Sequence, residues 1–167
     1  MTKEEVRALV DRLRARKEPS PLAPKGPRDA ALNDALGKLA ASSVEERSVK
    51  SALFLWNDDL AASHALAQEI ETQTASYLHG VMHRREPDYE NSKYWFKKVG
   101  RHPLFPAVHA AALGLLPPEF RKAVGKEWDP FRMVDWCAKG EPRAALEALQ
   151  AREIELLADH CIDVAGY

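Results

Sequence analysis

The sequence predicts an all-α protein, a single domain of about eight or nine helices. Apolar residues recur every three to four positions in one segment after another, which is the spacing of a helix face. Prolines and capping residues separate these segments, and none of them shows the alternation and β-branched enrichment of a strand. With 167 residues, 46% of them apolar, the chain is long enough to bury about two-thirds of its unfolded surface.

The chain divides into three regions of different composition. Residues 1–17 are predicted to form an amphipathic N-terminal helix, because apolar residues recur there at helical spacing. These residues are Val6, Leu9, Val10 and Leu13. Residues 18–28 hold four prolines within nine positions, too many for a helix, so we expect a Pro-rich linker or a strap over the surface. Residues 29–167 are predicted to form the helical domain itself.

Capping signals place the individual helices of that domain. Ser43 and Glu46 form a capping box, which predicts a helix start. Asp129 followed by Pro130 predicts another, with Asp as the N-cap and Pro in the first helical position. In chain order, helices are expected over about 29–41, 44–56, 60–71, 74–86, 89–100, 108–115, 131–139 and 142–164, with only a partial turn over 120–126.

Two neighbouring segments, Leu53–Ile70 and Leu78–Val99, each have the pattern of helix, turn and helix. Their turns lie 29 residues apart, which is close to the period of helical-hairpin repeats. The second segment resembles a tetratricopeptide repeat at Gly80, Asp88, Tyr89, Ser92, Phe96 and Pro103. The resemblance implies antiparallel helical hairpins that are tetratricopeptide-like in part. It departs from the repeat where His79 and His83 replace an expected Leu and an expected aromatic residue.

Composition and charge argue against several classes of function. The 24 basic and 25 acidic residues leave a net charge of −1, so we expect no overall attraction to nucleic acid or to an anionic membrane. No apolar run approaches the roughly 18 residues that a membrane helix needs, and the N-terminal region is too charged for a signal peptide. Cys137 and Cys161 are then expected to be free thiols. We therefore expect a cytoplasmic protein without a membrane or nucleic-acid partner.

The first candidate site is the pair His79 and His83. Because they are one helical turn apart, both imidazoles can reach a single ion or substrate atom, and they can act as catalytic acid and base near neutral pH. A divalent metal such as zinc or iron would need a third ligand, which His64 or Glu71 on the preceding helix can supply, as can Glu86. The alternative is a pair of hydrogen-bonded histidines that line a seam between helices.

The second candidate site is the run from Arg84 to Glu86. An arginine fork can hold a carboxylate or a phosphate through two hydrogen bonds, so we expect a small anionic ligand, with Arg84 on the histidine face to hold it. Arg85 is expected near the turn and exposed to solvent, because adjacent residues on a helix point in different directions. The alternative is that Arg84 pairs within the molecule, with Asp88 or Glu90.

The third candidate site is on the following helix, where Asn91, Lys93 and Tyr94 precede Trp95. Aromatic rings beside lysines can stack nucleobases, but aromatic residues on a helix more often belong to the core, and nucleic acid is not the expected partner. We expect Asn91, Lys93 and Tyr94 to line a ligand site or to contact a protein partner.

The runs SHALAQ and HGVMHRREPDYENSKYWFKKVGRHP, between Ser63 and Pro103, carry a wider resemblance. They resemble a family of helical proteins from bacteria and fungi with the signature SHxxxQ and HxxxHRREPDYxNxKYWFxxVGxHP. The later WDPFRMVDWC and LLADHC resemble the C-terminal half of the same family. The resemblance implies one fold over most of residues 53–166, without an assigned activity. It places in the defining segment His64, Gln68, His79, His83, Arg84, Glu86, Asp88, Asn91, Lys93 and Tyr94.

Two functions are therefore expected from the sequence. The leading one is a small cytoplasmic helical protein whose polar His/Glu/Arg pocket binds a small anionic ligand or a metal, and which can be an enzyme. In that pocket Gln68 lies one turn beyond His64 on the same helix. The alternative is a tetratricopeptide-like protein–protein interaction module without catalysis. The sequence indicates no oligomeric state.

Overall fold

The computed structural model describes residues 1–167 and consists of ten α-helices without a strand. The predicted all-α class is therefore confirmed. The helices are α1 (Lys3–Arg14), α2 (Ala30–Lys38), α3 (Val44–Trp56), α4 (Leu60–Ala67), α5 (Gln73–Arg85), α6 (Tyr89–Val99), α7 (Phe105–Leu115), α8 (Pro118–Val124), α9 (Pro130–Lys139) and α10 (Arg143–Ala165).

The helix count exceeds the expected eight or nine because α8 is a complete short helix, where only a partial turn was expected. Two boundaries also differ from the prediction. Helix α4 ends at Ala67 instead of near residue 71, and the chain uses the next residues to turn back toward α5. Helix α7 begins at Phe105 and includes Pro106. A proline is tolerated there because the first turn of a helix has no intrahelical partner for its missing N–H.

The predicted caps form as the sequence indicated. The hydroxyl of Ser43 accepts a hydrogen bond from the backbone N–H of Glu46 at 3.1 Å, and the Glu46 carboxylate accepts from the backbone N–H of Ser43 at 3.3 Å. Asp129 caps α9, with Pro130 in the first position. A second capping box, between Thr2 and Glu5, starts α1, and the sequence analysis did not identify it. Each box satisfies two backbone donors that would otherwise lack a partner.

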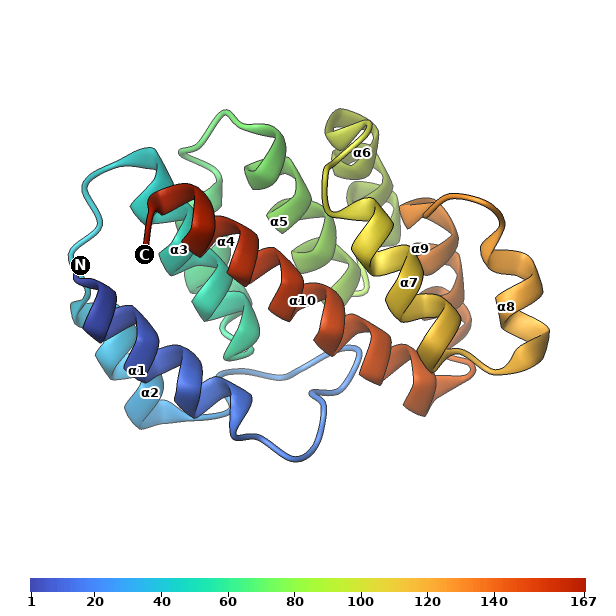
Figure 1. The fold of residues 1–167 in the computed structure, drawn as a ribbon, viewed down its shortest axis with the longest axis horizontal. Helices are drawn as coiled ribbons and strands as arrows, with labels where there is room; N and C mark the ends of the chain where they lie inside the picture. Colours follow the sequence, from blue (N-terminus) through green and yellow to red (C-terminus); the bar gives the residue numbers. More distant parts are fainter.

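Helices α3 to α6 form two antiparallel hairpins that lie side by side (Figure 1). In the first turn Asp58 adopts a left-handed conformation with φ 69°, and Asp59 caps α4. In the second hairpin the ring of Phe96 packs directly on Gly80, where a side chain would not fit. The hydroxyl of Ser92 donates to the carbonyl of Gly80 at 2.6 Å. Small residues on both helices thus allow α5 and α6 to approach closely.

Helix α10 runs across the hairpins and contacts both α3 and α7 (Figure 1). Its buried residues contribute to two hydrophobic cores. The larger core has 23 buried residues from α1 to α6, α9 and α10, and the smaller has 11, from the Pro-rich segment and α7 to α10. Because α10 packs on the face of α3, a partner helix cannot lie against that face as it lies in the groove of a tetratricopeptide array.

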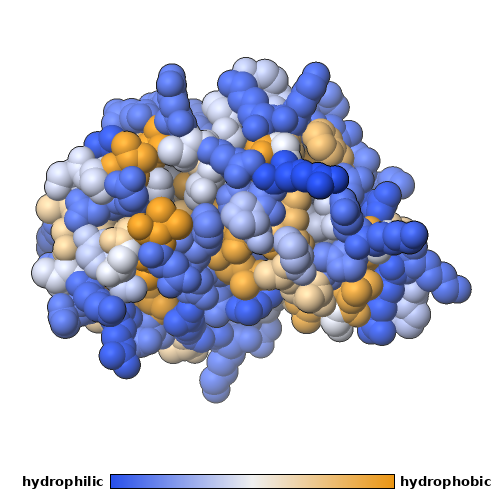
Figure 2. Space-filling view, turned by 45° about the horizontal axis from the view of Figure 1, so that its top comes forward, coloured by the Kyte–Doolittle hydropathy of each residue, from blue (hydrophilic) through white to orange (hydrophobic).

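The Pro-rich segment 18–28 runs beneath α10 and returns to α2 (Figure 1). Its Leu22 is buried in the smaller core, and Gln150 of α10 donates to the carbonyls of Pro21 and Leu22 at 3.5 and 3.4 Å. We call residues 18–28 the strap. None of the ten helices is long and apolar enough to cross a membrane. Figure 2 shows one face of the molecule, on which hydrophilic residues predominate and apolar residues form small separate groups.

Candidate functional site

Helix α5 carries three of the predicted site residues, His79, His83 and Arg84, and its second half is buried on every side. The nine consecutive residues Tyr77–Arg85 are all buried. Five of them are polar or charged, if the phenol of Tyr77 is counted with the histidines and arginines. Buried polar groups are costly without partners, so the contacts of each side chain determine what the site can do. Because neighbouring residues point in different directions, these side chains reach three separate environments.

The first environment is formed by His64 of α4 with His79 and His83 of α5, which we call the histidine cluster. The ring centroid of His64 lies 5.2 Å from that of His79 and 5.5 Å from that of His83. The centroids of His79 and His83 are 6.1 Å apart. The structure thus brings together the three histidines that the sequence analysis grouped. His64 is half-buried, and its ring forms no hydrogen bond within the protein.

The ring of His79 has one nitrogen engaged and one free. Its Nδ1 lies 3.0 Å from the backbone carbonyl of Ala75. A carbonyl can only accept, so Nδ1 carries the proton and Nε2 presents a lone pair. That Nε2 is buried and has no hydrogen-bond partner. The ring stacks on Trp95 at 3.9 Å between centroids. Burial lowers the pKa of His79 to about 4, against the opposing effect of its hydrogen bond to Ala75, so the ring is neutral near pH 7.

The ring of His83 is held from both sides. Its Nδ1 lies 3.1 Å from the carboxylate of Glu86 and therefore donates to it. Its Nε2 lies 3.2 Å from the side-chain nitrogen of Asn91, from which it accepts. Burial lowers the pKa of His83, and the carboxylates of Glu86 and Asp88 oppose that shift. Three of the predicted site residues, His83, Glu86 and Asn91, therefore meet at one point.

The metal set predicted from the sequence is not assembled in full. No group of three or more His, Cys, Asp or Glu side chains is placed to hold a metal ion. Glu71 is exposed in the connection between α4 and α5, at the opposite end of α5 from His83. The Nε2 of His83 is turned to Asn91. The expectation that Glu71 joins the histidines fails because α4 ends one turn early and the chain turns away there.

The second environment is the core between α5 and α10, where Arg84 lies. Its guanidinium is 2.5 Å from the carboxylate of Glu153, and both side chains are fully buried. The phenol of Tyr77 donates to the same carboxylate at 2.8 Å, and Gln150 accepts from Arg84 at 3.4 Å. Arg84 therefore pairs within the molecule, as the alternative interpretation held, but with Glu153 and not with Asp88 or Glu90.

The third environment is the turn between α3 and α4, which Arg85 reaches. Its guanidinium lies 2.5 Å from the carboxylate of Asp58 and 2.7 Å from the backbone carbonyl of Leu55. The expectation that Arg85 is exposed to solvent was wrong, because its residue is only 1% exposed. The acceptor groups that allow its burial come from residues about 30 positions earlier, which helix geometry alone does not reveal.

The remaining predicted residues lie on the surface. Gln68 is exposed at the end of α4. Lys93 of α6 forms an ion pair with Asp135 of α9 at 2.7 Å. Tyr94 is 53% exposed, and the ammonium group of Lys98 lies 4.7 Å from the centre of its ring. These residues therefore do not form a single pocket with the histidine cluster.

The sequence analysis missed Glu153 and Asp58 as the partners of the two arginines. One signal was available for the first. Along α10 the apolar stripe is interrupted by Gln150 and Glu153, three residues apart, and both are buried. Two polar residues on the buried face of a helix require polar partners, and a neighbouring buried arginine is the obvious one. For Asp58 the pattern shows only a turn.

Comparison of the chain with protein-family models, with curated proteins and with solved structures found no significant match. The resemblance to helical proteins of bacteria and fungi therefore stays a prediction.

Proposed function

We propose that the protein binds a divalent transition-metal ion, zinc or iron, at the histidine cluster. The observation that carries the proposal is the free Nε2 of His79, which is buried and has no partner while Nδ1 donates to the carbonyl of Ala75. Metal-binding histidines typically have this arrangement, with one nitrogen held by an acceptor and the other left for the ion. A buried lone pair without a partner is otherwise unfavourable.

The environment of His83 supports the same proposal. Its Nδ1 donates to the carboxylate of Glu86, which fixes the ring and raises the electron density on Nε2, as a carboxylate does behind a metal-bound histidine. Its Nε2 accepts from Asn91 at 3.2 Å. Metal binding would replace that hydrogen bond with a bond from Nε2 to the metal. Asn91 thus occupies the His83 nitrogen that would become the ligand atom.

His64 is the proposed third ligand. The three ring centroids lie 5.2 to 6.1 Å apart, but no three donor groups converge, so the proposal requires His64 to turn. It is the ring best able to do so, because it is half-buried and forms no hydrogen bond within the protein. Three imidazoles leave one position of a tetrahedral ion open. An open position can hold a water molecule activated for hydrolysis, which is the enzymatic form of the proposal.

The arginine expected from the sequence to hold an anionic ligand does not reach the histidine cluster, and Lys98, which lies near it, is placed over the rings of Tyr94 and Trp95. Arg84 and Arg85 both point away from the cluster and are already paired. The proposal for the histidine cluster is therefore restricted to a metal.

The test is the metal content of protein purified without a histidine tag, measured by elemental mass spectrometry, followed by calorimetric titration with Zn²⁺. We expect about one ion per chain in the wild type. The His79→Ala/His83→Ala double variant should lose it, because two of the three ligands are gone. His109→Ala is the matched control, since His109 lies on α7, away from the cluster, and its ring forms a hydrogen bond only with the carbonyl of Gly125. No ion in purified wild type together with no heat on titration would refute the proposal.

A second candidate function is protein–protein interaction through the surface of α6. It is favoured by Tyr94, a large aromatic side chain that is half-exposed and held in place by Lys98. Exposed aromatic residues of this kind often anchor partners. If this is the function, Tyr94→Ala should abolish capture of a partner that the His79→Ala/His83→Ala variant still binds. Equal capture by both variants would exclude the Tyr94 surface.

A further inference from the structure

A cavity of about 410 Å³ lies between the strap, the end of α1, the end of α3 and the middle of α10. Its walls include Trp56 of α3, Gln150 and Ile154 of α10, and Leu13 of α1. The volume is within the range of sites for small molecules, about 300 to 1,000 Å³. No residue of the histidine cluster lines it, so any ligand bound here would be held separately from the proposed metal.

The charges around this cavity are unbalanced. Six basic side chains line it, and three acidic ones, Glu18, Asp58 and Glu155. The basic residues are Arg14, Arg16, Lys17, Arg28, Arg85 and Arg152. Asp58 is paired with Arg85, and Glu155 is shared by Arg14 and Arg152.

Three of these basic residues, Arg16, Lys17 and Arg28, form no ion pair with a carboxylate. Burial lowers the pKa of Arg16, and Asp58 opposes that shift while the positive charge of Arg28 adds to it. Like charges brought together without a counterion repel one another. An anion bound in the cavity would therefore reduce the repulsion between these basic side chains.

The arginines are fixed in place before any ligand arrives. The guanidinium of Arg16 donates to the carbonyl of Trp56 at 3.0 Å and to the side chain of Asn57. Arg28 donates to the carbonyl of Glu18 at 2.7 Å, across the base of the strap. Arg85 is 1% exposed, and its Nε is buried without a hydrogen-bond partner. Preorganised donors bind an anion more tightly, because less conformational freedom is lost on binding.

We propose that this cavity binds a small molecule bearing a phosphate or carboxylate group, held by Arg16, Lys17 and Arg28. Guanidinium groups match both of these anions in geometry. The indole of Trp56, which is half-buried in the cavity wall, would cover an apolar or planar part of the same molecule. The proposed anionic ligand is thus held by residues of the end of α1 and the strap, and not by Arg84 as the sequence analysis expected.

The experiment is a titration of the wild-type chain with inorganic pyrophosphate and, separately, with citrate at low salt. The part of the fluorescence change that a Trp56→Phe variant lacks reports on Trp56, because the chain has four tryptophans, and the melting temperature reports on binding to the folded state. We expect a saturable change with at least one probe. Saturation with pyrophosphate alone assigns a phosphate, saturation with citrate alone assigns a carboxylate, and saturation with both assigns the shared oxyanion chemistry.

Two variants locate the effect. Lys17→Gln removes a charge from a side chain that forms no hydrogen bond or ion pair in the structure, so its fold should be unchanged. Arg28→Gln also removes the bond across the strap. Each should weaken binding about tenfold, the loss expected for one charge-assisted hydrogen bond.

Arg101→Gln is the matched control, because Arg101 is almost fully exposed, does not line the cavity, and is near only Glu127 at 4.0 Å. The control should bind as the wild type does. No saturable change with either probe would overturn the proposal, as would Lys17→Gln and Arg28→Gln variants that bind with wild-type affinity.

Discussion

At the scale of single residues, the strongest constraint is the buried ion pair between Arg84 and Glu153. Both side chains are inaccessible to solvent, and the phenol of Tyr77 and the amide of Gln150 form further hydrogen bonds with the pair. Two charges removed from water are tolerable only together, since each without the other would keep the full desolvation penalty. The pair therefore specifies how α5 and α10 pack, more than it adds to their stability.

This reasoning predicts a strong coupling between the two residues. Arg84→Met or Glu153→Met alone should lower the free energy of unfolding by about 3–5 kcal/mol, because each leaves one buried charge without its partner. The double variant should lose much less than the sum of the two. Urea denaturation of the four proteins in the cycle measures the coupling. Additive losses would show that the pair does not interact as the structure indicates.

At the scale of the helices, the contact between α5 and α6 depends on the absence of a side chain at Gly80. A Cβ atom placed there would lie 2.9 Å from two ring carbons of Phe96. The ring is 1% exposed and packs edge-to-face on Tyr77, so it has no room to yield. Close packing of the Phe96 ring thus explains why a glycine stands at position 80, which is also a position of the tetratricopeptide pattern.

Gly80→Ala should therefore destabilise the protein by about 1–3 kcal/mol through overpacking. The matched control is Gly114→Ala in α7, where nothing lies within 4 Å of the added Cβ. There the alanine should stabilise by about 0.4–1 kcal/mol, because it restricts the unfolded chain and favours the helix. Opposite shifts of the urea midpoint are expected. A Gly80→Ala variant as stable as the wild type would mean that Phe96 can move aside.

Local patterns predicted the helices well, because caps and turns are determined by neighbouring residues. The box at Ser43 and the start at Asp129 needed no information from elsewhere in the chain. The histidine cluster was also accessible, since His79 and His83 share a face by geometry alone. The carboxylates with which Arg84 and Arg85 pair could not be predicted in this way. From Tyr77 to Arg85, α5 is buried on all sides, so no periodicity distinguishes its faces, and the two arginines find their carboxylate partners in α10 and in the turn between α3 and α4.

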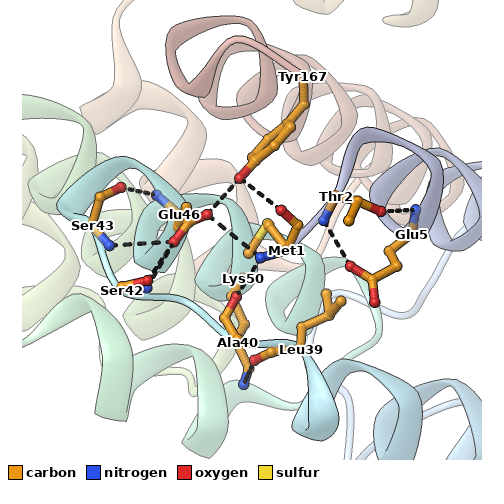
Figure 3. A network of polar contacts seen from close by, with 10 residues as sticks. All are labelled: Met1, Thr2, Glu5, Leu39, Ala40, Ser42, Ser43, Glu46, Lys50 and Tyr167. Carbon is orange, nitrogen blue, oxygen red and sulfur yellow. Dashed lines mark hydrogen bonds and ion pairs between the residues drawn. The ribbon is translucent and has the colours of Figure 1, made fainter.

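At the scale of the whole molecule, the two ends of the chain meet at Glu46 of α3 (Figure 3). The phenol of Tyr167 donates to the Glu46 carboxylate at 2.5 Å, and its oxygen also lies 3.2 Å from the carbonyl of Met1. The amino group of Met1 lies 3.5 Å from the same carboxylate. The hydrogen bonds from Tyr167 and from the backbone N–H groups of Ser42 and Ser43 lower the pKa of Glu46 from 4.5 to about 2.

Because the folded-state pKa of Glu46 lies below its ordinary value, its contribution to stability is fully present above pH 4.5. It is lost as the pH falls through about 2. Glu46→Gln keeps a residue that suits the capping box but removes the charge. The variant should be less stable than the wild type near pH 7, and the gap should close toward pH 2.

Urea midpoints across that range measure the difference between wild type and Glu46→Gln. Glu69→Gln is the control, because the exposed Glu69 side chain forms no hydrogen bond or ion pair, and it should show no such pH dependence. A gap between wild type and Glu46→Gln that is unchanged from neutral to acid pH would contradict the assigned role of the carboxylate.

The side-chain amide of Gln150 connects the buried ion pair to the strap. Its oxygen accepts from Arg84 in the core, and its nitrogen donates to the strap at Pro21 and Leu22. The strap is thus hydrogen-bonded to a side chain of the interior, since Gln150 is itself only 1% exposed. Before a protease can cut this segment, the hydrogen bonds from Gln150 to the strap must break. The rate of cleavage between residues 18 and 28 therefore measures how often the packing around Gln150 opens, and not only the flexibility of a surface loop.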